Sequence, residues 1–226
     1  MRNKLLILLF LLLQGNAFSE QTIQEGVATF EFSYPDAESS DVFAYKPKGI
    51  KIYFKKDKSR EEYDHLSRWV NIVDPDKKEI LFMNTPNAKT AMKMTMKEKE
   101  ENQALEFGIY DVKVTDETKD IAGYKCKKAI VTYKGKITGD EERTMEVWFT
   151  EQLRVTNTQY FFKGINGFIM RYTHVTTPDA NVTFREVLTC TKVEKTTVSD
   201  DMFRIPDDCK ISNWEDVNKH VKIEYP

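Results

Sequence analysis

The sequence predicts a mainly β protein in which antiparallel strands form a meander, either a barrel or a strongly curved sheet. Two observations carry this prediction. Apolar and polar residues alternate with a period of two in segment after segment, as in strands with one buried face and one exposed face. These segments are short and are separated by turn residues, so we expect consecutive strands to pair with one another.

The N-terminus has the features of a secretory signal peptide. A basic start is followed by an apolar run over residues 5–13, and the small residues Ala17 and Ser19 precede Glu20. This run is too short to cross a bilayer as a helix. We therefore expect cleavage of residues 1–19, export of a soluble protein, and a single β-rich domain over residues 20–226.

The mature chain is mildly acidic and holds an odd number of cysteines. Loss of Arg2 and Lys4 with the signal peptide takes the formal net charge from −2 to −4, with both signs mixed along the chain. Such a surface does not favour nucleic acid as a partner. In an oxidising compartment cysteines tend to pair, and Cys190 with Cys209 is favoured by proximity in sequence, although the pairings with Cys126 stay open.

The N-terminal half reads as a series of strands. Residues 26–34 alternate cleanly and predict a first strand, and residues 50–55 predict a second strand with a charged outer face. Residues 69–73 and 79–83 flank an Asp-Pro-Asp-Lys-Lys sequence, which favours a tight turn. These two segments are therefore expected to form a hairpin.

The segment over residues 89–97 predicts a strand with a methionine face. Met92, Met94 and Met96 occupy alternate positions, with polar residues between them. In a helix the same methionines would spread around more than half of the circumference, which is a poor amphipathic pattern. A short exposed helix or loop is expected to follow over residues 98–104.

The best-defined element is a hairpin over residues 121–153, with strands around a polar turn at residues 134–142. A strand that starts at residues 111–115 leads into it. The aromatic segments 160–162 and 168–172 then enclose a glycine-containing turn. The expected elements that follow are a turn at 176–181, a long strand from 182 towards 193, an extended piece at 202–206 and a last helical turn at 214–220.

The sequence holds no recognisable catalytic motif. His65, His174 and His220 stand alone, without a second ligand at metal-binding spacing. A nucleophile elbow, a zinc-protease helix and a phosphate-binding glycine loop are all missing from the sequence. We therefore expect no catalytic residue, no metal ligand and no cofactor, and we do not expect an enzyme.

The methionine face and the aromatic residues are the features that suggest a ligand. Methionine is flexible and polarisable, which suits an apolar surface that accepts guests of different shapes. The simpler alternative is that these residues form an ordinary core. The candidate ligand-binding residues are Phe30, Phe32, Met92, Met94, Met96, Val147, Phe149, Phe168 and Met170.

Three motifs carry a resemblance to a known family. The run that contains Gly123-Tyr124-Lys125-Cys126, the strand Val147-Trp148-Phe149-Thr150 and the turn that starts at Gly164 resemble an uncharacterised family of exported Bacteroidetes proteins, near the GLPGLI group. The closing Phe203-Arg204-Ile205-Pro206 resembles the usual end of that family. The broader similarity is to the lipid and lipoprotein carriers LolA, LolB and LppX. It implies a curved, half-open antiparallel barrel covered by a helical lid.

From this resemblance and the methionine face we expect a periplasmic protein of the Gram-negative envelope. The hypothesis is that it binds a lipid or a lipoprotein acyl chain in the concave face of the half-barrel. The alternative is an interaction module that docks another envelope protein and has no ligand cavity.

Overall fold

The computed structural model describes residues 23–36, 46–65, 68–84, 89–134, 141–153, 155, 162–179, 182–214 and 216. The expected signal peptide at residues 1–19 and most of the expected last helical turn at 214–220 lie outside these ranges. Over the described part of the chain, the structure holds no helix with the length and apolar character needed to cross a membrane.

The described strands form one sheet of twelve, in the order β12-β6-β5-β4-β3-β2-β1-β11-β10-β9-β8-β7. The strands are β1 (Glu25–Ser33), β2 (Gly49–Lys55), β3 (Lys58–Asp64), β4 (Val70–Asp74), β5 (Glu79–Met83), β6 (Thr90–Thr95), β7 (Ile109–Ile121), β8 (Tyr124–Lys134), β9 (Arg143–Thr150), β10 (Phe168–Asp179), β11 (Val182–Glu194) and β12 (Lys210–Asn213). The described helices are α1 (Met96–Phe107) and the short 3-10 helix η3 (Asp200–Phe203).

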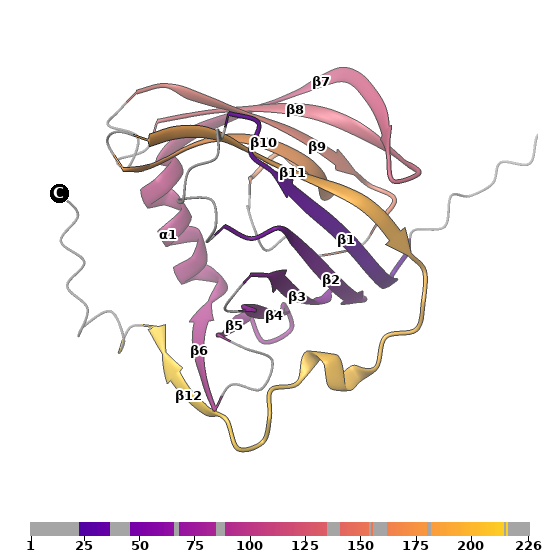
Figure 1. The fold of residues 1–226 in the computed structure, drawn as a ribbon, viewed down its shortest axis with the longest axis vertical. Helices are drawn as coiled ribbons and strands as arrows, with labels where there is room; N and C mark the ends of the chain where they lie inside the picture. The colour runs from indigo at the N-terminus through magenta and orange to yellow at the C-terminus, as the bar shows by residue number, and fades with distance from the viewer. Residues whose placement is uncertain are drawn as a thin grey trace, which may run out of the picture.

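Two meanders join to make this sheet. Consecutive strands pair antiparallel from β1 to β6 and from β7 to β11, and β1 then pairs antiparallel with β11. The sheet curves without closing into a barrel, with β7 at one edge and β12 at the other, and α1 lies within the curve (Figure 1). The predicted curved, half-open sheet with one helical lid is therefore confirmed.

The last strand corrects the expectation of a purely antiparallel sheet. β12 pairs parallel with β6, with Lys210 opposite Thr90 and Asn213 opposite Lys93. After β11 the chain passes through η3 and runs back along the sheet before it reaches β6 (Figure 1). This long return brings β12 in along the same direction as β6, which a tight hairpin could not do.

Most predicted strands lie where the alternation indicated. The first two strands, the two hairpins β4–β5 and β8–β9, and the long strand β11 are all confirmed. The segment 160–161 falls outside the described residues. The predicted turn at 176–181 begins later than expected, because β10 continues to Asp179.

Three local predictions are wrong. β3 was not expected at all, because its sequence is charged and does not alternate. Met96 is the first residue of α1 rather than the third residue of a methionine face, because Thr95 and Glu98 form a capping box that starts the helix there. The piece at 202–206 was expected to be extended, but residues up to Phe203 belong to η3, which Ser199 caps.

The sheet carries apolar side chains on both faces in its N-terminal half. The inner face is the one under α1, with Phe54 and Ile80 fully buried. On the outer face, a smaller cluster around Val70 and Ile72 packs against Phe203 and other residues of the C-terminal segment. The main core lies under the strands from β2 through β1 to β8.

Candidate functional site

The predicted methionine face lies on the inner face of β6, beneath α1. Strand pairing lines up one row of side chains across five strands, because directly opposed residues share a face. This row consists of Ile52, Glu61, Asn71, Phe82 and Met92. The next row consists of Phe54, Ser59, Val73, Ile80 and Met94.

The two rows differ in how well they are covered. All members of the row that ends in Met94 are at most 5% exposed. In the other row, Phe82 and Met92 are only half-buried, although they lie on the same face. The inner face therefore offers apolar side chains near the β6 edge that the fold does not fully cover.

The helix over this face has a polar middle. Residues 97–103 of α1 read Lys-Glu-Lys-Glu-Glu-Asn-Gln, and the described contact with the methionine face is polar, from Asn102 Nδ2 to Met94 Sδ at 3.8 Å. The apolar anchor is Phe107 at the C-terminal end, whose ring contacts those of Tyr133 and Phe162 at centroid distances of 4.8 and 5.2 Å.

A buried carboxyl group lies in the half-covered row. Glu61 is 1% exposed, and its Oε2 accepts hydrogen bonds from Tyr63 Oη and Asn71 Nδ2, both at 3.2 Å. Burial raises the pKa of Glu61 to about 7, against the opposing effect of these hydrogen bonds and of the Lys99 ammonium on α1. This group was missed from the sequence, because it stands in a charged run with nothing local to mark it as buried.

The other candidate ligand-binding residues lie mainly in the packed core. Phe30 and Phe168 pack edge to face at a centroid distance of 5.8 Å. Phe32 is half-buried and stacks on Tyr34 at 6.2 Å. The remaining ones, each at most 2% exposed, are Val147, Phe149 and Met170.

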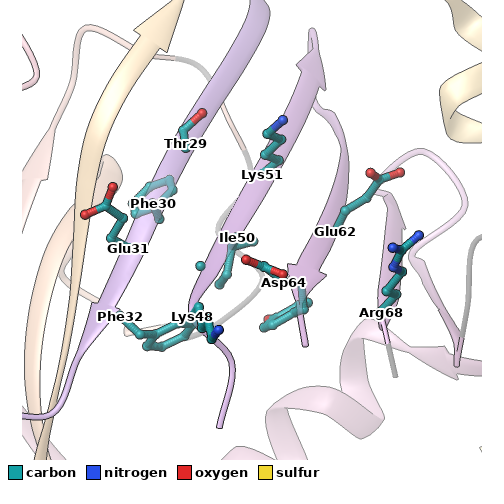
Figure 2. Close-up of a pocket in the computed structure, with 12 residues that line it drawn as sticks. Thr29, Phe30, Glu31, Phe32, Lys48, Ile50, Lys51, Glu62, Asp64 and Arg68 are labelled. Carbon is teal, nitrogen blue, oxygen red and sulfur yellow. The ribbon is translucent and has the colours of Figure 1, made fainter. Parts of the chain in front are cut away.

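A groove of about 700 Å³ crosses the ends of β1, β2 and β3 (Figure 2). Thr29, Lys51 and Glu62 line it from the outer face, whereas Phe30 and Ile50 alternate with them and are buried on the inner side. Its volume falls in the range of small-molecule sites. Its lining is mixed, because polar groups such as Lys51 and Glu62 meet the apolar side chains of Ile50 and of the candidate residues Phe30 and Phe32.

The predicted disulfide between Cys190 and Cys209 is not formed, since all three cysteines are free thiols. Cys190 belongs to the main core, whereas Cys209 packs against the separate cluster on the outer face. Burial raises the pKa of Cys126 to about 11 and that of Cys190 to about 12. Both thiols therefore stay protonated at neutral pH.

Of the three histidines, His220 lies outside the described residues, within which no group of three His, Cys, Asp or Glu side chains could hold a metal ion. His174 is instead buried, with its Nε2 at 2.9 Å from Tyr133 Oη. Burial, together with the nearby Arg143 charge, lowers the pKa of His174 to about 4.

Comparison with solved structures shows the fold. The chain is similar to PNGF-II, with a TM-score of 0.51 and 18% identity over 84% of this chain and 31% of that one, so it spans about a third of that protein. It is also similar to the lipoprotein LppX of Mycobacterium tuberculosis, with a TM-score of 0.35 and 10% identity over 79% of this chain and 90% of LppX. A shared fold does not fix a function.

Comparison with sequences shows the family. No curated protein matches the chain. The model of a domain of unknown function, DUF4412, matches residues 25–164, which is more than half of the chain. The expectation of an uncharacterised family is therefore confirmed, and this protein belongs to the DUF4412 family.

Proposed function

We propose that this protein binds a hydrophobic chain, the acyl part of a lipid or of a lipoprotein, on the inner face of its sheet beneath α1. In this proposal it works in the periplasm and has a carrier role rather than a catalytic one. The observation that carries the proposal is the mismatch between α1 and the face it covers. A helix with a polar middle lies over the apolar side chains of Phe82, Met92 and Met94.

Such a helix is a poor permanent cover. An ordinary surface helix buries an apolar stripe against the core, and most of its stability comes from that packing. Here residues 97–103 offer charged and amide side chains instead. An acyl chain inserted under α1 would bury apolar surface of Phe82 and Met92 that is now half-exposed, at about 25 cal/mol per Å² removed from water.

Binding requires α1 to lift, because Met94 is only 5% exposed in the closed arrangement. The position of α1 supports such a movement. It follows directly from β6, which lies next to the edge strand β12, and it ends at Gly108, whose φ of 53° suits a hinge at a glycine. Lifting α1 would expose both rows of the inner face next to the buried Glu61.

The first test is to purify the mature protein from a periplasmic extract without detergent and to identify extracted lipids by mass spectrometry. We expect a stoichiometric lipid that is lost in Met92→Lys. Lys93→Gln is the matched control, because Lys93 lies on the opposite face of β6 and pairs with Glu79 at 3.2 Å. A lipid-free protein that also fails to bind an apolar fluorescent probe would contradict the proposal.

A helix staple tests the lifting of α1 directly. Met94→Cys with Asn102→Cys replaces two side chains whose polar atoms lie 3.8 Å apart, so a short bifunctional thiol reagent that links the two cysteines would lock the helix on the sheet. We expect the cross-linked variant to lose probe binding and the same variant without the cross-link to keep it. Equal binding in both states would show that the ligand does not enter beneath α1.

A second candidate function, an interaction module, is favoured by the edge strand β7. Ile109 and Val114 on this strand are 87% and 45% exposed. Charges and a bulge beyond Val114 protect the rest of β7 from pairing, so a partner strand would add to its first half. The test is whether Ile109→Lys with Val114→Lys releases an envelope protein that copurifies in stoichiometric amount with the wild type.

A further inference from the structure

Trp148 on β9 lies between two cationic side chains on the face opposite to Val147. Strand pairing sets Lys128 of β8 and Arg171 of β10 directly opposite Trp148, on either side. A third cation reaches the ring from β7, since Lys119 Nζ lies 3.9 Å from the ring centroid. Four neighbouring strands therefore bring three cations to one tryptophan.

Of these three cations, only Lys128 forms an ion pair in the described part of the chain, although the Glu146 carboxylate also acts to raise the pKa of Lys119. Lys128 Nζ pairs with Glu146 and Glu117, both at 3.1 Å, and the Trp148 indole N–H donates to Glu146 at 2.7 Å. Within the part of the chain that the structure describes, the side chains of Lys119 and Arg171 form no hydrogen bond or ion pair. Two positive charges are thus left next to an indole that is 6% exposed.

The guanidinium of Arg171 is the more unusual of the two. Its Nε is buried and has no hydrogen-bond partner, and buried donors without a partner are rare in folded proteins. Burial and the charge of Arg171 both lower the pKa of Lys119, which indicates that the two cations are close enough to repel each other.

Irregularities in the strand pairing flank the same place. The register of β7 against β8 shifts between Val114 and Thr118, just before Lys119. The register of β10 against β9 shifts between Ile169 and Arg171. Bulges change the direction of the side chains beside them and occur often next to functional sites. Both cations without an anionic partner therefore follow a bulge.

We propose that Lys119 and Arg171 together bind an oxyanion, a carboxylate, phosphate or sulfate group, beside the ring of Trp148. The guanidinium offers a planar group of N–H donors, and the ammonium adds a mobile point charge. The site lies on the C-terminal half of the sheet, away from β6 and on the face opposite to Val147. It is thus independent of an acyl chain on the inner face, and either proposal can fail without the other.

The test uses the indole N–H signals in a two-dimensional ¹⁵N NMR spectrum. The chain has three tryptophans, so Trp148→Phe identifies the signal of Trp148. Inorganic phosphate, sulfate and acetate are titrated separately at constant ionic strength. We expect a saturable shift of the Trp148 signal, and the comparison of acetate with phosphate and sulfate distinguishes a carboxylate site from a site for tetrahedral oxyanions.

Two variants make the test specific. Lys119 lies on the edge strand, and the Lys119→Met variant keeps an aliphatic side chain over Trp148. We expect this variant to bind the anion at least tenfold more weakly. Lys113→Met removes an exposed lysine from the same strand and should leave the affinity unchanged. Arg171→Lys keeps the charge but removes the fork of donors, and it should also weaken binding.

Three outcomes would overturn the proposal. The first is a shift that stays linear with anion concentration, because that indicates general screening rather than a site. The second is an equal affinity for the anion in the Lys119→Met and Lys113→Met variants. The third is a Trp148 signal that responds to none of the three anions.

Discussion

Replacing Glu61 with glutamine should stabilise the protein at neutral and basic pH and leave its stability at acidic pH unchanged. The carboxyl group is buried on the inner face, and its pKa rises from 4.5 to about 7 on folding. The native state therefore keeps a proton that the unfolded chain releases between these two values. Stability contributed by Glu61 is present below about pH 4.5 and is lost as the pH rises to about 7.

The expected size follows from the difference between the two pKa values. One pKa unit corresponds to about 1.4 kcal/mol, so the shift from 4.5 to about 7 gives about 3 kcal/mol at pH 8. Glutamine has no proton to lose, and its amide oxygen can still accept the hydrogen bonds from Tyr63 and Asn71. Glu61→Gln should therefore raise the free energy of unfolding by up to about 3 kcal/mol at pH 8.

The assay is urea unfolding followed by tryptophan fluorescence at several pH values between 4 and 8. Glu31→Gln is the control, since it makes the same change in net charge on the exposed face of β1. We expect a gain in stability that grows with pH for Glu61→Gln and not for the control. A gain of the same size at pH 4 and pH 8, or no gain at pH 8, would refute the reasoning.

Other predictions concern single groups elsewhere in the fold. In the Glu61→Gln variant, acidification from pH 6.5 to about 4 should destabilise the protein by about 3 kcal/mol in urea unfolding, because burial lowers the pKa of His174 and the unfolded chain binds that proton first. In the wild type the opposite pH dependence of Glu61 offsets most of this loss. A flat profile in Glu61→Gln would argue against a buried neutral histidine. In native alkylation at pH 8 followed by mass spectrometry, Cys209 should react fast, whereas Cys126 and Cys190 should react only after unfolding. Recovery of a disulfide-linked peptide would contradict three free thiols. Thr95→Ala should cost about 1 kcal/mol in urea unfolding by removing the capping box of α1, and Thr95→Ser should restore most of it.

Local sequence predicted the strands that have one apolar face and one polar face. β1 and the hairpin β8–β9 were found because their side chains alternate, and that alternation reflects the same burial the structure has. β3 was not predicted from the sequence, because both of its faces carry polar residues. Its inner face holds Ser59 and Glu61, which are buried by their neighbours on β2 and β4.

The candidate site could be predicted only in part. Met92 and Met94 were expected on one face of a strand, and they lie there. Met96 was misassigned because the capping signal of Thr95 and Glu98 competes with the alternation, and the helix signal prevails. The buried carboxyl of Glu61 could not be foreseen, because its burial comes from strand register and from the position of α1.

The sequence by itself determined the fold class, the position of most strands and, within those strands, which side chains share a face. These properties depend on the two-residue period and on local turn chemistry. Only the tertiary structure decided that β1 pairs with β11, that α1 covers the inner face, and that Lys119, Trp148 and Arg171 meet from three strands. Such contacts form between residues that are far apart in the sequence, and they depend on how the strands pair and how the sheet curves. No local sequence pattern encodes them.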